Sequence, residues 1–415
     1  MLRRGFVAKR AAGERMGGVR NESFWLSLIF AFSLVGCASL PRDPVPPAYA
    51  DKVAVLDGAQ VRYWGDRAPS NINALAAEKW AQVKATRPYL LKQGTRPQIS
   101  FLAVSGGGSD GAFGAGLLVG WTARGNRPEF DIVTGISTGA LTAPFAFLGP
   151  RYDSALKQVY TTYSTDQLVT KQPIRGLLGG EGLASNAPLA QVIASYVDED
   201  FLKQVAHEHA RGRRLLIGTT NLDAQRPVIW DMGKIASSGD PRALELFRNV
   251  LLASAAIPGV FPPVYIDVKV EGQVREEMHV DGGTTNQVFL LPTQIRSGAM
   301  DAKLGIDPVR HLYIIRNGRV APEFKAVKAS TLAIAGRSIS TLIKTQGIGD
   351  LYQMYEFAQE NHVDYNVTYI PGNFPDTSTE AFDPKYMSQL FDLGFKLGKS
   401  GTEWKKTPPR LSNPL

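Results

Sequence analysis

DIVTGISTGALTAPFAFLG, residues 131–149, places a short apolar run, a glycine-flanked serine and a second apolar run in direct succession. The β-branched first run predicts a buried strand, and the longer second run predicts a helix. Between them, GISTG at 135–139 fits the G-x-S-x-G pattern, in which a sharp strand-to-helix turn exposes a nucleophilic serine. Ser137 is therefore the candidate nucleophile, flanked by the motif residues Gly135 and Gly139. A tight turn with an incidental serine is the alternative.

A second glycine-rich turn lies upstream, after an apolar run at 99–104 that also predicts a strand. Its glycines are Gly106, Gly107, Gly108 and Gly111. Their spacing fits a dinucleotide-binding fingerprint, but Asp131 begins the next strand, whereas the acidic residue of that fingerprint ends it. Bare N–H groups before a helix also bind anions, so we expect Gly106, Gly107 and Gly108 to form an oxyanion hole. A nucleotide-binding protein is the alternative.

No histidine lies near Ser137, so the serine needs another base. Asp281 ends a predicted strand and precedes Gly282 and Gly283, so its carboxylate can project at the carboxyl edge of the sheet, where α/β sites collect. Desolvation can raise the pKa of a carboxylate enough for it to act as a base. The alternatives are a turn-forming Asp-Gly pair without a catalytic role and His279 as a rival base. His279 points to the same face as Asp281, and we expect it to be a packed strand residue.

The rest of the central sequence continues to alternate strands and helices. Further strands are predicted at 214–219, 228–231, 264–270, 274–280 and 311–316, and helices at 71–91, 112–123, 241–255 and, for the most part, 327–362. The chain of 415 residues is 44% hydrophobic and 20% charged, which is typical of a globular protein with a core. The alternation favours a three-layer α/β/α sandwich with a mainly parallel central sheet.

Four motifs in this order resemble the patatin-like phospholipase family. They are the glycine turn at 106–111, GISTG at 135–139, SAAIPGVFPP at 254–263 and DGG at 281–283. The resemblance covers roughly residues 100–291. It implies the patatin-like fold, a Ser137–Asp281 dyad without histidine, and an oxyanion hole in the glycine turn. The family usually has Arg or Lys where this chain has Asp110, a departure that bears on a phospholipid substrate but not on the backbone oxyanion hole.

The resemblance also implies the reaction. We expect a lipid acyl hydrolase of the phospholipase A or lysophospholipase type, which forms an acyl-enzyme on Ser137 with Asp281 as the base. A catalytically silent lipoprotein that serves as an interaction module, and an acyltransferase that uses the same dyad, are the alternatives. The expected partner is a phospholipid or another acyl-ester lipid. No metal motif such as H-E-x-x-H occurs in the sequence, and we expect neither a metal nor a cofactor.

The N-terminal residues read as the leader of a bacterial lipoprotein. Residues 1–36 contain six Lys or Arg and two Glu, and the apolar run at 24–35 is shorter than the roughly 20 residues that span a bilayer. LVGC at 34–37 resembles a lipobox, which implies that Cys37, the only cysteine, is lipidated and anchors the chain to the membrane. The alternatives are an ordinary cleaved signal peptide and a buried free cysteine. Met16 is a second possible start.

The residues after the cysteine and the charge pattern bear on location and partners. Ala38 and Ser39 follow Cys37, and the lack of Asp at the second mature position favours an outer-membrane lipoprotein of the bacterial cell envelope, periplasmic or surface-facing. The formal net charge is +8, and the basic leader supplies part of that excess, so we expect no nucleic-acid partner. Oligomeric state is open.

Four regions are therefore predicted along the chain. They are a lipoprotein signal peptide over 1–36; a lipidated Cys37, proline-rich spacer and N-terminal helix over 37–97; a patatin-like catalytic core over 98–320; and a C-terminal helical extension packed on the core over 321–415.

Overall fold

The computed structural model divides the chain into two units, Met1–Pro41 and Arg42–Leu415. It describes residues 42–92, 96–172, 180–291, 298, 301–302 and 305–409. The predicted leader and Cys37 lie outside the described residues, so the lipoprotein assignment stays a prediction. Among the described helices, none has the length and apolar character needed to cross a membrane.

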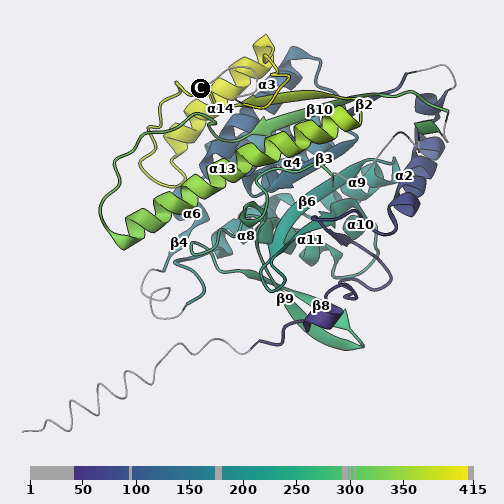
Figure 1. Ribbon diagram of the computed structural model, residues 1–415, viewed down its shortest axis with the longest axis horizontal. Helices are drawn as coiled ribbons and strands as arrows, with labels where there is room; N and C mark the ends of the chain where they lie inside the picture. The colour runs from purple at the N-terminus through teal and green to yellow at the C-terminus, as the bar shows by residue number, and fades with distance from the viewer. Residues whose placement is uncertain are drawn as a thin grey trace, which may run out of the picture. The chain divides into compact units, whose positions relative to one another are not determined.

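The second unit is built on a sheet whose centre is parallel (Figure 1). Five strands run parallel in the order β6 (Arg214–Asn221), β3 (Ile132–Ile136), β2 (Gln98–Val104), β10 (Val309–Arg316) and β11 (Val363–Tyr369). Four antiparallel strands extend it beside β6: β7 (Arg226–Asp231), β1 (Arg62–Trp64), β9 (Gln273–Asp281) and β8 (Val264–Val270). The parallel order places the carboxyl ends of β2, β3 and β10 side by side.

Two apolar cores cover the two faces of this sheet, because successive side chains of a strand point to opposite faces. Along β2, Leu102 and Val104 belong to the larger core, and Phe101 and Ala103 to the smaller one. The larger core takes in α3 (Gly111–Arg124), α4 (Thr138–Leu148), α5 (Asp153–Thr161), α8 (Ala187–Tyr196), α9 (Glu199–Ala210), α11 (Ala243–Ser254) and α14 (Pro384–Ser400). The smaller core packs the second half of α13 (Thr331–Glu360) and, through Trp80, α2 (Ile72–Thr86). The arrangement confirms a three-layer α/β/α sandwich.

The remaining described elements are short. They are η1 (Pro47–Tyr49), η2 (Pro88–Leu91), η3 (Gly108–Asp110), η4 (Pro150–Tyr152), η5 (Gly282–Thr284), α6 (Thr165–Leu168), α10 (Met232–Ala236), β4 (Thr170–Lys171) and β5 (Ala184–Ser185).

Helices α3 and α14 approach each other through glycines. A Cβ atom at Gly116 would lie 2.0 Å from the carbonyl oxygen of Phe391, and one at Gly394 would lie 2.2 Å from that of Phe113. Because these positions carry no side chain, the two backbones come into direct contact. This contact fixes α3, whose N-terminus carries the glycine turn.

The structure differs from the sequence predictions at two places. The helix predicted over 71–91 ends at Thr86 and continues as a separate turn from Pro88, because a proline disfavours helical geometry in the residue before it. In the C-terminal region, Val363–Tyr369 forms β11, which pairs along its length with β10. This region was predicted to contain helices only, since an edge strand of seven residues gives a weak periodic signal beside a helix of 30.

Candidate active site

Ser137 occupies the turn between β3 and α4 with a strained backbone. Its φ of 55° and ψ of −126° are rare for a residue with a side chain. The flanking glycines make the turn possible, because a Cβ at Gly135 would lie 2.3 Å from the Gly139 carbonyl oxygen, and one at Gly139 would lie 2.2 Å from that of Val104. The sequence prediction of a strand, a sharp turn and a helix is confirmed in this segment.

A serine from another helix holds this turn. The backbone N–H of Ser137 donates to Ser254 Oγ at 3.0 Å, and the Ser254 hydroxyl donates to the carbonyl oxygen of Gly218 at 2.7 Å. Ser254 ends α11 and is fully buried. It therefore fastens the turn to β6. Sequence reasoning found the 254–263 segment but not the contact of its first residue.

Strand register brings Asp281 to Ser137. Ile136, the last residue of β3, pairs with Gly218 of β6, so Ser137 falls level with Thr219. Thr219 pairs with Asp281 at the end of antiparallel β9. Strands β3 and β9 thus meet end to end along the same side of β6, and the hydroxyl of Ser137 donates a hydrogen bond to the Asp281 carboxylate.

The environment of Asp281 suits a base. The side chain is 5% exposed, and its Oδ1 accepts the N–H of Gly283 at 2.7 Å. Burial raises the pKa of Asp281 to about 6, against the opposing effects of the hydrogen bonds from Ser137 and Gly283. The adjacent Gly282 is required sterically, since a Cβ there would lie 2.5 Å from the Gly218 carbonyl oxygen.

The glycine turn lies beside the serine, but its three glycines differ in what their N–H groups do. The N–H of Gly106 donates to the carbonyl oxygen of Gln287 at 3.0 Å, so the expectation that Gly106 contributes to an oxyanion hole needs correction. Within the described part of the chain, the N–H groups of Gly107 and Gly108 have no hydrogen-bond acceptor. These two therefore remain as candidate oxyanion donors. The φ of Gly108, 57°, favours glycine.

Residues from the end of β10 brace this turn. The carbonyl oxygen of Gly106 accepts from the Ser105 hydroxyl at 2.7 Å and from Arg316 Nη1 at 3.1 Å. The backbone N–H of Asn317 donates to Ser105 Oγ at 2.8 Å, and a Cβ at Gly107 would lie 2.0 Å from the Asn317 carbonyl oxygen. Sequence reasoning missed Arg316 and Asn317, since neither belongs to a recognisable motif.

Asp110, where the family that the sequence resembles usually has Arg or Lys, faces a neighbouring helix. Its Oδ1 accepts from the hydroxyl of Tyr386 on α14 at 2.7 Å, and Arg319 donates to the same hydroxyl at 3.5 Å. Burial raises the pKa of Asp110. The motif residue Gly111 follows, and a Cβ there would lie 2.1 Å from Thr138 Oγ1, so the glycine turn and the serine turn pack directly on each other.

His279, the rival base, and Asp131, the acidic residue of the alternative nucleotide-binding pattern, both have hydrogen-bond partners within the fold. His279 is fully buried, with Nδ1 3.0 Å from Thr219 Oγ1 and Nε2 3.2 Å from Glu277 Oε2, so it is the packed strand residue that was expected. Asp131 accepts from Arg87 Nη1 at 2.9 Å and from the N–H of Ser100 at 3.0 Å. Both residues are therefore committed to holding strands together.

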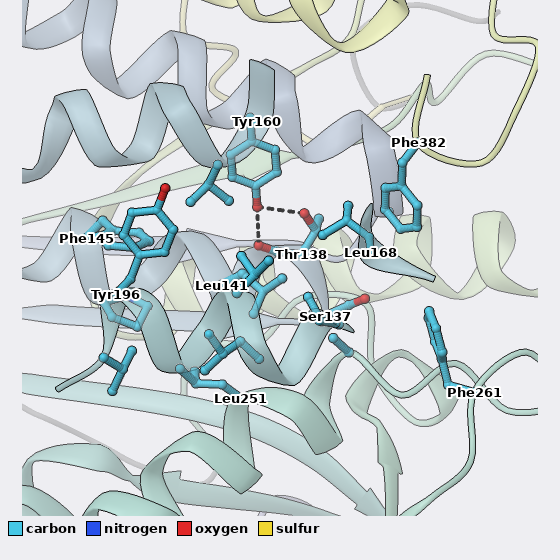
Figure 2. A pocket seen from close by; sticks show the side chains of 18 of the residues that line it. Ser137, Thr138, Leu141, Phe145, Tyr160, Leu168, Tyr196, Leu251, Phe261 and Phe382 are labelled. Atoms are coloured by element: carbon cyan, nitrogen blue, oxygen red, sulfur yellow. Dashed lines mark hydrogen bonds between the residues drawn. The ribbon is translucent and has the colours of Figure 1, made fainter. Parts of the chain in front are cut away.

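Ser137 opens onto an apolar pocket (Figure 2). Figure 2 shows Ser137 near Phe261 and Phe382, with Leu141 next to it and Phe145 and Tyr196 farther away. Side chains from α4, α5, α8 and α11 line the pocket. The hydroxyl of Tyr160, also in the wall, is satisfied by Thr138 and Thr142. The wall is thus largely apolar away from Ser137.

Comparison with known proteins was made by sequence and by structure. Residues 102–293 match the family model described as patatin-like phospholipase. A search of curated proteins by sequence found no match. Similar solved chains include VipD from Legionella pneumophila, 12% identical over 72% of this chain and 67% of that one, with a TM-score of 0.33. Human GIVD cytosolic phospholipase A2 is 10% identical over 82% and 64%, respectively, with a TM-score of 0.32.

Proposed function

We propose that the patatin-like phospholipase domain formed by residues 102–293 is a lipid acyl hydrolase that works through a Ser137–Asp281 dyad. The observation that carries the proposal is the hydrogen bond between a strained, pocket-facing serine and a buried carboxylate whose pKa is raised to about 6. A carboxylate with a pKa near the working pH is an effective proton acceptor.

In the acylation half, Asp281 takes the proton of the Ser137 hydroxyl while Oγ forms a bond to the ester carbonyl carbon. The N–H groups of Gly107 and Gly108, together with the N-terminus of α3, stabilise the oxyanion. As the intermediate collapses, the bond to the alcohol oxygen breaks, and Asp281 delivers its proton to that oxygen. The acyl group is then esterified to Ser137.

In the deacylation half, Asp281 removes a proton from water while the water oxygen bonds to the acyl carbon. The bond to Oγ breaks, the fatty acid leaves, and Asp281 returns the proton to Ser137. Both halves use the same oxyanion donors, and the complete cycle returns the dyad to its starting state.

The apolar pocket supports an acyl chain as the group held next to Ser137. Its walls offer little hydrogen bonding, so they favour a hydrocarbon over a sugar or a peptide. We therefore infer that the substrate is a phospholipid, a lysophospholipid or another acyl-ester lipid.

Active-site labelling and hydrolysis test the proposal together. A fluorophosphonate probe should label the wild type and leave Ser137→Ala unlabelled, and purified protein should release fatty acid from a lipid panel. Activity that survived in both Ser137→Ala and Asp281→Asn would reject the dyad. A wild type that is labelled but transfers acyl groups only to added alcohols would be an acyltransferase.

We also propose that Cys37 is lipidated and anchors the chain at the outer membrane. Labelling cells with a palmitate analogue should mark the wild type and not Cys37→Ser. Equal incorporation into both proteins would reject this assignment.

A further inference from the structure

Within the described residues, the exposed large apolar side chains are concentrated in one segment of the chain. Ten such side chains are exposed, and six of them lie between residues 324 and 343: Phe324, Val327, Ile334, Ile339, Leu342 and Ile343. Phe324 is 99% exposed and Leu342 is 69% exposed. Isolated exposed apolar residues are ordinary on a protein surface, but a concentration on one segment marks an interaction surface. We call residues 324–343 the apolar segment.

The apolar segment includes the first turns of α13, which continue a buried face of that helix. Ile339, Ile343, Gly347 and Leu351 follow at intervals of four residues and so lie on one face. Gly347 and Leu351 are buried, whereas Ile339 and Ile343 are exposed. In Figure 1 this first half of α13 forms the end of the long helix at the edge of the folded unit. The face that packs on the sheet in the second half of α13 is thus uncovered in the first.

The second half of α13 is joined to the candidate active site. Asp350 Oδ2 accepts the N–H of Gln287 at 2.6 Å, and the carbonyl oxygen of Gln287 accepts the N–H of Gly106. The helix is therefore connected to the glycine turn through Gln287. The same helix runs from within the apolar segment to this contact.

The loop before α13 makes a second connection to the site. It begins at Asn317, which packs on Gly107, and Glu323 in its middle forms ion pairs with both Arg319 and Lys344. Arg319 in turn contacts Tyr386, the partner of Asp110. The apolar segment thus emerges from the edge of the sheet that carries the glycine turn.

Charge distinguishes the kinds of partner for this segment. The apolar segment, residues 324–343, contains Lys325, Lys328 and Arg337 and no Asp or Glu. Lys325 and Lys328 are exposed beside Phe324 and Val327. Apolar side chains combined with basic ones are typical of helices that lie on anionic membrane surfaces. Two copies of this segment packed face to face would instead bring like charges together.

We propose that the apolar segment docks on an anionic lipid surface. The choice of lipid over a protein partner rests on the proposed lipid hydrolase function. Phe324 and the exposed apolar residues of α13 enter the lipid surface, and Lys325 and Lys328 contact lipid phosphates.

A single fluorescent label tests the docking site. Because Cys37 is the only cysteine, the full chain carrying Cys37→Ser and Leu342→Cys takes one environment-sensitive label. The matched control is Cys37→Ser with Val274→Cys, since Val274 is 60% exposed on β9. Vesicles contain phosphatidylethanolamine and phosphatidylglycerol with nitroxide-labelled lipid, or phosphatidylcholine with the same quencher. Any binding of the N-terminal region to the vesicles occurs in both labelled proteins. The difference in quenching between them therefore reports only the surroundings of the two labels.

We expect the label at position 342 to be quenched several-fold more than the label at 274, and more on anionic than on zwitterionic vesicles. Lys325→Glu with Lys328→Glu should remove the preference for anionic lipid. Equal quenching at the two positions would overturn the proposal. So would a blue shift at 342 that grows with protein concentration in the absence of lipid, because it would identify a second copy as the partner. Quenching needs no turnover, so a protein that docks without hydrolysing lipid refutes the proposed function alone.

Discussion

At the scale of single residues, the buried carboxylate of Asp281 links activity to stability. Its pKa is raised from 3.8 to about 6, so the folded state binds a proton more tightly than the unfolded state does. Stability from this residue is then fully present below pH 3.8 and is lost as the pH rises through about 6. The ionised form that takes the serine proton is therefore the form that burial disfavours.

Asp281→Asn should separate these two effects. Hydrolysis of a soluble ester by the wild type should rise with pH through about 6, and the variant should be inactive at every pH. At pH 7 to 8 the variant should be more stable, by up to roughly 3 kcal/mol for a shift of about two pKa units. Denaturant titrations of both proteins at several pH values measure this difference. A difference that did not shrink between pH 6 and pH 4 would contradict the pKa.

We infer that Arg316 positions the proposed oxyanion donors. Its guanidinium donates a hydrogen bond to the carbonyl oxygen of Gly106, the residue directly before Gly107 and Gly108. Arg316→Met should lower kcat for a soluble ester by ~10–100-fold with little change in KM, because misplaced donors weaken transition-state binding. Arg316→Lys should restore part of kcat. A rise in KM alone, or loss of activity only through unfolding in a thermal melt, would contradict this role.

At the scale of elements, sequence patterns predicted those parts of the site whose residues are close together in the sequence. GISTG and DGG each contain a proposed catalytic residue and the glycines that shape its turn, so Ser137 and Asp281 were predicted together with their surroundings. The supporting contacts are not local. The bond from Ser137 to Ser254 spans 117 residues, and that from Arg316 to Ser105 spans 211. Such pairs follow from the order of strands in the sheet, which no single motif encodes.

The helical contact between α3 and α14 provides a test at this scale. Gly116→Ala should lower the free energy of unfolding by about 1–3 kcal/mol, since the added methyl group meets the Phe391 carbonyl oxygen. The control is Gly349→Ala in α13, where a Cβ would lie in open space and alanine favours helix by about 0.5–1 kcal/mol. Chemical denaturation of both variants measures the two effects. Equal changes in stability would mean that the α3–α14 contact is not close.

At the scale of the whole molecule, the pocket depends on the complete fold. Its walls come from α4, α8 and α11 and from Phe261 and Phe382, which lie far apart in the sequence. The sequence predicted α4 and α11, placed α14 within a C-terminal helical extension without giving its bounds, and left α8 unassigned. The general layer structure was therefore predictable from periodicity, whereas the shape of the pocket was not, because it depends on how side chains of distant helices meet.

Leu141→Trp should change which esters the protein accepts. Leu141 lies in the pocket next to Ser137, so a larger side chain there should block long acyl chains and leave short ones room to bind (Figure 2). We expect kcat/KM for a sixteen-carbon ester to fall by about tenfold or more relative to a four-carbon ester. Val274→Trp, on the exposed surface, is the control. An unchanged ratio in Leu141→Trp would place the acyl chain elsewhere.

The left-handed backbone of Ser137 has an evolutionary consequence. A glycine at this position would adopt the same φ without strain, so the proposed catalytic role gives a reason for a side chain there. In a lineage that no longer needs hydrolysis, Ser137→Gly becomes a stabilising change, and Asp281 loses its reason to be acidic. Descendants that keep the fold only as a scaffold should therefore lose these two residues before they lose Gly135 or Gly139, which the packing of the turn itself requires.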